Sequence, residues 1–381
     1  MRGASLLTEY REVSNKYGLE AQERRLAMNE HSTVKTSQTI GEDLGDRTSE
    51  LCVLDAKGQV ERRLRMATTA EAVQRTFEGL AACRVVMEAG THSPWMSRLL
   101  QARGHEVVVA NPRKVRLIGA SISKDDQRDA ELLARLGRVD VKLLAPIQHR
   151  GAEVQRDRAL LQVRGTLVQM RSMLINQVRG LAKSHGQRVP KCSAESFPKH
   201  ARATLEAELF LGQALLLEHI ETLTQSVRGL DRRLEQMCTQ DYPETLRLRQ
   251  ITGVGPITSL TFVLSLETPS RFRRSRSVGA YLGLRPKRRD SGERRPELRI
   301  TKAGDSELRQ LLVQCAHYIL GPFGPDCDLR RFGERLIAQG GKRAKKRARV
   351  AVARKLAVLL HALWRSGEHY EPLRHASALA A

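Results

Sequence analysis

The order of predicted strands and helices between residues 39 and 136 constrains the fold more than any other feature of the sequence. The first three predicted strands follow one another closely, and Lys57-Gly58 between two of them is typical of a hairpin turn. Helical patterns accompany the later strands, at Thr69–Leu80, Pro94–Arg103 and Asp125–Leu136. Apolar and β-branched runs place the strands at Thr39–Leu44, Glu50–Leu54, Gln59–Met66, Arg84–Met87 and Glu106–Ala110.

This β-β-β-α-β-α-β-α order predicts an α/β domain with a mixed sheet flanked by helices. It matches the ribonuclease H-like fold. The main alternative is a flavodoxin-like sheet, but such sheets alternate strands and helices from the start. We therefore expect the first and fourth strands to be neighbours, with the last helix packed across them.

Residues 151–245 show a different, heptad pattern. Apolar residues recur at spacings of four and three, which is typical of an a/d seam on long helices. The pattern fits an antiparallel hairpin within one chain and an oligomerising coiled coil equally well. The seam residues are Leu160, Leu167, Leu174 and Leu181 in one run, and Leu216, Ile220, Leu223, Val227, Leu230, Leu234 and Met237 in the other.

These patterns predict four parts of the chain. Residues 1–38 mix charges without a period, which indicates a flexible extension. Residues 39–150 form the α/β domain, and residues 151–245 form the coiled-coil helical region. Residues 246–370 form a mainly helical C-terminal domain that ends in a basic tail.

Charge indicates the class of partner. Lys and Arg number 65 against 42 Asp and Glu, which gives a formal net charge of +23 at pH 7. Such an excess favours a polyanion, most often nucleic acid. Aromatic residues make up 4% of the chain, which excludes base stacking as the main mode of binding. The positive charge is concentrated in Arg271–Lys302 and Lys342–Lys355.

The apolar stretches and the cysteines indicate the cellular compartment of the protein. No stretch approaches the roughly 20 apolar residues that a membrane span needs. The six cysteines form no CxxC pair, which fits a reducing compartment and argues against a zinc site. We therefore expect a cytoplasmic protein without a membrane partner.

The turn Ile251–Pro256 lies between two helical patterns and contains Gly253 and Gly255. Such a turn exposes backbone N–H groups that can hold a phosphate without reading bases. A plain corner between helices has the same pattern.

Four acidic residues lie where the predicted fold brings elements together. Asp43 ends the first strand and Glu88 ends the fourth, while Asp126 and Asp129 share one face of the following helix. Each alone is readily explained as a surface residue or a helix cap. Together they predict a carboxylate cluster, which needs a hard cation such as Mg²⁺ or Mn²⁺ to neutralise it.

Short motifs in both halves of the chain, in order from about residue 39 to 370, carry a family resemblance. They resemble the DEDD transposases of the insertion-sequence one-ten family (IS116/IS110/IS902 type), in its one-one-one-one branch. The chain departs from the family pattern at Gly45-Asp46, where a Lys is usual, and at Asp290, where many members have serine. The motifs are Gly41-Glu42-Asp43-Leu44-Gly45, Met87-Glu88-Ala89-Gly90, Lys124-Asp125-Asp126-Gln127-Arg128-Asp129, Ile251-Thr252-Gly253-Val254-Gly255-Pro256, Asp290-Ser291-Gly292-Glu293 and Arg299-Ile300-Thr301-Lys302-Ala303-Gly304-Asp305.

The resemblance implies a RuvC-like domain followed by a transposase domain. It implies that Ser291 attacks a DNA phosphate to form a covalent phosphoserine link, beside Mg²⁺ held by the four acids Asp43, Glu88, Asp126 and Asp129. It also implies a structured non-coding guide RNA of the bridge type, which selects donor and target DNA. The enzyme would act as a dimer or tetramer, associated with the bacterial nucleoid.

Basic residues close to Ser291 in the sequence would stabilise charge on the phosphate and contact nucleic acid. These residues are Arg285, Lys287, Arg288, Arg289, Arg294, Arg295 and Lys302, and Gly253 and Gly255 would contribute backbone groups.

Two other functions fit parts of the pattern. A RuvC-like, structure-specific DNA endonuclease would use metal-activated water, and Ser291 would have no role. A non-enzymatic, basic nucleic-acid-binding scaffold would use the acids only structurally. A covalent protein–DNA adduct separates the transposase from both.

Overall fold

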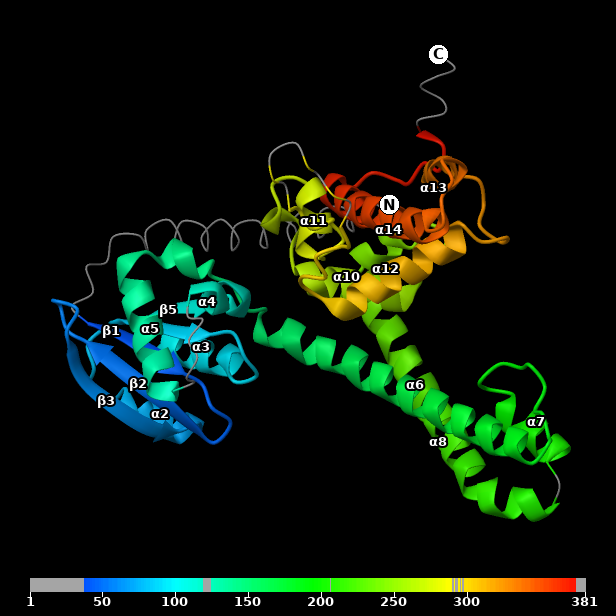
Figure 1. The fold of residues 1–381 in the computed structure, drawn as a ribbon, viewed down its shortest axis with the longest axis horizontal. Coiled ribbons are helices and arrows are strands. Elements are labelled where there is room, and N and C mark those ends of the chain that lie inside the picture. Colours follow the sequence, from blue (N-terminus) through cyan, green and yellow to red (C-terminus); the bar gives the residue numbers. More distant parts are fainter. Residues whose placement is uncertain are drawn as a thin grey trace, which may run out of the picture. The chain divides into compact units, whose positions relative to one another are not determined.

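A five-stranded mixed sheet forms the centre of the N-terminal part of the protein (Figure 1). The computed structural model describes residues 38–118, 125–205, 207–289, 291, 294, 296 and 298–374, so the predicted extension lies outside the described residues except for Gln38. The chain separates into two compact units, one ending at Arg150 and the other beginning at Gly151.

The sheet has the order β3-β2-β1-β4-β5. Strands β1, β2 and β3 pair antiparallel, whereas β1 pairs parallel with β4 and β4 pairs parallel with β5. The predicted neighbourhood of the first and fourth strands is therefore confirmed. The strands are β1 (Thr39–Asp43), β2 (Thr48–Leu54), β3 (Val60–Ala67), β4 (Arg84–Glu88) and β5 (Glu106–Ala110).

Helices cover both faces of the sheet. Val73 of α2 (Ala70–Thr76) and Met96 of α3 (Ser93–Ala102) join the apolar cluster on one face, together with Ile40 and Val53. Helix α5 (Asp126–Val139) packs against β1, β2 and β4 on the other face. Short helices α4 (Pro112–Ile118) and η1 (Val141–Leu144) lie on either side of α5 in the chain. This mixed sheet with helices on both faces is consistent with the predicted RuvC-like α/β domain.

Two long helices begin the second unit. Helix α6 (Ala152–Ser184) and helix α8 (Ala207–Gln240) pack against each other, with α7 (Phe197–Thr204) between them in the chain. The seam residues Ile220, Val227 and Leu234 of α8 are buried within the chain. Part of the apolar seam is therefore buried within one chain, where α6 packs against α8. A coiled coil between chains stays a prediction.

Seven further helices follow in the described part of the second unit. The α10 helix is buried from Thr258 to Leu266, because apolar residues lie on all its sides and other helices cover each of them. Helix α14 packs against α9, α11, α12 and α13. The bounds are α9 (Glu244–Leu248), α10 (Pro256–Leu266), η2 (Pro269–Arg271), α11 (Arg276–Tyr281), α12 (Ser306–Ile319), α13 (Asp328–Ala338) and α14 (Ala344–Ser366).

Candidate active site

Two of the predicted acids lie at the same edge of the sheet. Asp43 is the last residue of β1 and Glu88 is the last residue of β4. The two strands are parallel, and Glu42 is paired with Met87. Asp43 follows Glu42 and Glu88 follows Met87, so the backbones of Asp43 and Glu88 lie side by side.

Helix α5 brings the other two acids to this edge. Its N-cap is Asp125, whose side chain accepts a hydrogen bond from the backbone N–H of Gln127. Because Asp125 takes the capping role, Asp126 and Asp129 remain for another function in the first turn. One carboxylate oxygen from each of Asp43, Asp126 and Asp129 lies within 4.8 Å of the others. Glu88 is not part of this group of mutually close oxygens.

The close approach of α5 to the sheet depends on two glycines. A Cβ atom on Gly41 of β1 would lie 2.0 Å from the carbonyl oxygen of Ala130 and 2.5 Å from the backbone nitrogen of Ala134. A Cβ atom on Gly137 of α5 would lie 2.3 Å from a methyl carbon of Val86. The absence of both side chains therefore lets α5 lie directly on the sheet and carry its acids to Asp43.

The donor set suits a hard divalent cation. Three carboxylates this close repel one another, and a cation between them removes that repulsion. All three supply oxygen, which is the ligand type of Mg²⁺ and Mn²⁺. Asp126 is exposed while Asp43 and Asp129 are half-buried, so an ion could enter from solvent and still contact substrate.

The sequence analysis did not single out Glu42, which precedes Asp43. Its side chain is fully buried, and neither carboxylate oxygen has a hydrogen-bond partner among the residues that the structure describes. Burial raises the pKa of Glu42 to about 8. Alternation along β1 directs Glu42 to the face opposite Gly41 and Asp43. The motif therefore contains two acids in different environments, and the only hint in the sequence was the position of Glu42 inside a buried strand.

Ser291 belongs to the second unit and is exposed. Ser291 and Arg294 exchange both backbone hydrogen bonds, at 3.2 and 3.0 Å. Further along the same two segments, Lys287 donates its N–H to the carbonyl of Arg299, and Thr301 donates to Arg285. The described residues of these two segments therefore pair antiparallel, in an arrangement that we call the Ser291 hairpin and that the sequence analysis did not predict.

The base of this hairpin is closely packed. Gly283 has a φ of +69°, and a Cβ atom there would lie 2.2 Å from the backbone nitrogen of Ala303. The Nη1 atom of Arg309 donates to the carbonyl oxygens of Leu282 and Ala303, at 3.0 and 2.8 Å. One guanidinium thus joins the two segments where they leave the helical core.

A buried ion pair extends this base to α6. Arg158 lies 2.7 Å from Asp305, and the two side chains are 11% and 7% exposed. The side chain of Asp305 also caps α12 by accepting from the N–H of Leu308, and it accepts from the hydroxyl of Ser265. Asp305 therefore connects α6, α10 and α12 beside the hairpin.

Most of the basic residues predicted around Ser291 are exposed. Arg285, Lys287, Arg288 and Arg289 precede it, and Arg294 follows it across the turn. Lys302 is exposed at the base of the hairpin, with a φ of +55°. Arg295 lies outside the described residues. The described basic residues thus give the segments on both sides of Ser291 an exposed positive charge, which favours binding of a phosphate group.

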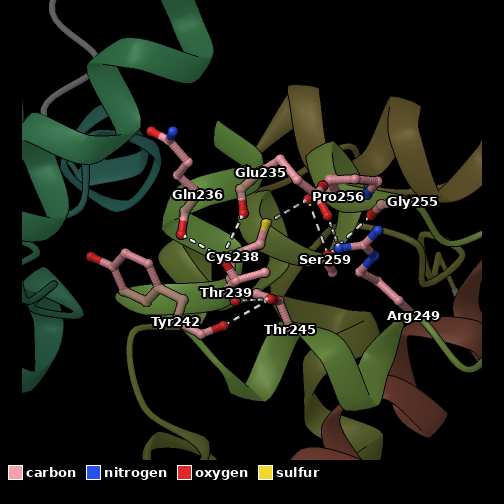
Figure 2. Close-up of polar contacts among 10 residues, drawn as sticks. All are labelled: Glu235, Gln236, Cys238, Thr239, Tyr242, Thr245, Arg249, Gly255, Pro256 and Ser259. Carbon is pink, nitrogen blue, oxygen red and sulfur yellow. Dashed lines mark hydrogen bonds and ion pairs between the residues drawn. The ribbon is translucent and has the colours of Figure 1, made fainter. Parts of the chain in front are cut away.

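Polar contacts hold the turn that contains Gly253 and Gly255 (Figure 2). The Ser259 hydroxyl donates to the carbonyls of Gly255 and Pro256, and the Cys238 thiol also donates to Pro256. Gly253 has a φ of +93°, and a Cβ atom there would lie 3.0 Å from the ring of Tyr318. The turn is thus a fixed corner between α9 and α10, and its contact with nucleic acid stays a prediction.

Comparison with known proteins identifies the family. A family model for DEDD transposases of the IS110 type matches residues 40–186, and the model described as "Transposase IS116/IS110/IS902 family" matches residues 246–325. A transposase for insertion sequence element IS1328 of Yersinia enterocolitica is 31% identical over 286 residues, which cover 73% of this chain and 82% of the relative. The chain belongs to the IS110 family of insertion-sequence transposases. It is therefore a DNA transposase, and DNA is its substrate.

Two relatives cover more of the transposase. The transposase for insertion sequence element IS1111A of Coxiella burnetii is 28% identical over 349 residues, which cover 89% of this chain and 92% of the relative. A probable family 20 transposase of Pseudomonas aeruginosa is 28% identical over 342 residues, which cover 87% and 98%. Similarity thus extends across both units of the transposase, and the two family matches include all four acids and Ser291.

None of the described helices combines the length and the apolar character that crossing a bilayer requires.

Proposed function

We propose that this transposase cleaves and exchanges DNA strands through a covalent link between DNA and Ser291, with Mg²⁺ held by Asp43, Glu88, Asp126 and Asp129. The observation that carries the proposal is the convergence of three of these carboxylates within 4.8 Å at the sheet edge. An exposed serine among arginines supplies the second chemical group.

The carboxylates have a defined role in this mechanism. Asp43, Asp126 and Asp129 would hold the ion, and Glu88 would complete its surroundings from the neighbouring strand end. When bound, the ion supplies positive charge that stabilises a phosphate in the transition state. The protein contributes fixed geometry, because β1 and α5 are held together at Gly41.

Ser291 performs the covalent step. Its Oγ atom forms a new ester bond to phosphorus, while the bond from phosphorus to one sugar oxygen breaks. Oγ loses a proton to a base in the surrounding water, and the departing sugar oxygen gains one. The number of phosphate ester bonds is unchanged, so the strand can later be rejoined without an external energy source.

We also propose that a structured guide RNA selects donor and target DNA, and that the active form is a dimer or tetramer in the cytoplasm. The net charge of +23 supports binding of more nucleic acid than one short DNA site. An exposed apolar stripe on α6 supports oligomerisation, with Val163, Met170 and Met173 exposed by 50, 43 and 63%.

A nuclease that uses activated water is the second candidate. One observation favours it: the acids and Ser291 belong to different compact units, so the acids form a cluster without any contribution from the serine. Such an enzyme would release free DNA ends and no covalent adduct.

The deciding experiment incubates end-labelled substrate DNA with the transposase, guide RNA and Mg²⁺, followed by a denaturing gel. The wild type should produce a slowly migrating protein–DNA band that protease removes. Ser291→Ala should abolish the band and the cleavage, since no other group replaces Oγ. Cleavage by Ser291→Ala at the wild-type rate would establish the nuclease instead.

Matched controls are available for both parts of the site. Ser306 is an exposed serine in the same unit, and Ser306→Ala should retain the adduct. Asp129→Asn should abolish cleavage, whereas Asp125→Asn should retain it, because asparagine caps a helix as well as aspartate does.

A further inference from the structure

Five arginine side chains converge in a pocket beside the Ser291 hairpin. The pocket has a volume of about 500 Å³, and its remaining lining is Ser277, Ala280 and Pro286. Three segments of the second unit form it: the start of α11, the segment of the Ser291 hairpin that precedes Ser291, and the middle of α14. The arginines are Arg274, Arg276, Arg285, Arg288 and Arg354.

These arginines lack the partners that other arginines of the protein have. Arg84, Arg164 and Arg202 form ion pairs with Glu106, Asp231 and Glu221, at 3.0, 2.7 and 2.5 Å. No acidic residue lines the pocket among the described residues. None of the five arginines forms a side-chain hydrogen bond or ion pair with any residue that the structure describes.

Five like charges in one concavity raise the energy of the folded protein unless an anion compensates them. The guanidinium group carries five N–H donors in a planar fork that matches phosphate oxygens. The aliphatic part of Arg354 also passes close to Gly279, where an added Cβ atom would lie 2.9 Å from its Cγ. These features indicate a site for phosphate groups.

The position of the pocket indicates which phosphates it binds. Arg288 precedes Ser291 by three residues, so their Cα atoms are at most about 11 Å apart. Successive phosphates of one strand advance by about 3.4 Å along the DNA axis. Even with the reach of the two side chains added, a phosphate bound at Arg288 would therefore lie within several nucleotides of the phosphate that Ser291 attacks.

We propose that this arginine pocket binds the backbone phosphates of the DNA strand that Ser291 attacks. The proposal rests on the proposed role of Ser291 for the identity of that strand. A guanidinium group can bind the phosphate of any nucleotide, so we expect this contact to position the strand whatever its sequence. A larger groove shares Arg276, Arg288 and Arg354 with the pocket, which gives the strand a path onward along α14.

The test uses Arg276→Gln combined with Arg354→Gln, which leaves the hairpin unchanged. The affinity for labelled substrate DNA is measured by fluorescence anisotropy over a range of salt concentrations. Loss of two phosphate contacts should reduce the slope of log K against log salt by about two and weaken binding about tenfold or more. The loss should be the same on a scrambled DNA sequence.

The matched control is Lys345→Gln combined with Arg349→Gln, which removes two positive charges from α14 outside both the pocket and the groove. It should leave the salt slope within error of the wild type. An equal decrease in slope for both double variants would overturn the proposal, because it would show a general charge effect. Loss of guide-RNA binding with unchanged DNA binding would overturn it as well.

Binding and adduct formation separate this proposal from the proposed mechanism. If the wild type forms the Ser291 adduct and the pocket variant binds DNA normally, the pocket assignment fails and the mechanism stands. If the pocket variant loses DNA binding as expected but the wild type forms no adduct, the phosphate site stands and the serine mechanism fails.

Discussion

Replacing Gly41 by alanine tests whether the contact between β1 and α5 assembles the carboxylate cluster. The new Cβ atom would lie 2.0 Å from the carbonyl oxygen of Ala130, whereas ordinary contacts of a Cβ begin near 3.4 Å. Both nearest atoms belong to the backbone of α5, so no side-chain rotation relieves the clash. The helix must retreat by about 1.4 Å, at a cost of about 1–3 kcal/mol.

The retreat should separate Asp126 and Asp129 from Asp43, because both aspartates move with α5. Mg²⁺ requires oxygen ligands at about 2.0–2.1 Å in near-octahedral geometry, so a shift of this size removes at least one ligand. We expect Gly41→Ala to raise the Kd for Mn²⁺ at least about tenfold, as changes to the supports of metal ligands do. Titration calorimetry with Mn²⁺ measures this without requiring activity.

The matched control is Gly90→Ala in the loop after β4. A Cβ atom on Gly90 meets no atom within 4 Å, and Gly90 is not among the glycines with positive φ. This variant should bind Mn²⁺ as the wild type does. Wild-type affinity in Gly41→Ala would refute the reasoning, because it would show that the cluster does not depend on how closely α5 approaches the sheet.

Two further predictions concern stability and assembly. Folding raises the pKa of Glu42 from 4.5 to about 8. Its contribution to the free energy of unfolding is therefore fully present below pH 4.5 and is lost as the pH rises toward 8. At pH 7 the loss is about 3 kcal/mol. Glu42→Gln should remove this loss, so urea unfolding with EDTA present should show a gain over the wild type that grows between pH 5 and 8; a gain independent of pH would contradict the raised pKa. If the exposed stripe of α6 joins protomers, Met170→Glu with Met173→Glu should give a folded monomer in analytical ultracentrifugation, and an unchanged oligomer would exclude this face.

The positions of the acids could be predicted from the sequence because they depend on strand order. Three close strands followed by strands that return through helices allow few sheet topologies, and parallel neighbours end at the same edge. The strand order alone therefore predicts that Asp43 and Glu88 lie at one edge of the sheet. The spacing of three between Asp126 and Asp129 likewise placed both on one helix face.

Other features depend on contacts between segments that no local pattern reveals. The close approach at Gly41 involves Ala130 and Ala134, about ninety residues later in the chain. The arginine pocket combines α11 and the hairpin with Arg354, which the sequence analysis placed in the basic tail. The Ser291 hairpin was missed because its segments are rich in arginine and proline and lack the alternation of a buried strand.

The hairpin base explains how an exposed serine can still have a defined position. A nucleophile must come within about 3–3.5 Å of phosphorus in the correct orientation, so a loosely attached loop would be a poor carrier. Here Arg309 joins the two segments at Leu282 and Ala303, and Asp305 ties the same region to Arg158 in the second turn of α6. Breaking a buried ion pair on one side costs about 3–5 kcal/mol, so this connection resists local opening. The serine is therefore accessible to DNA on the hairpin, while the orientation of the hairpin is set by the helical core that α6 enters directly after the boundary between the two units.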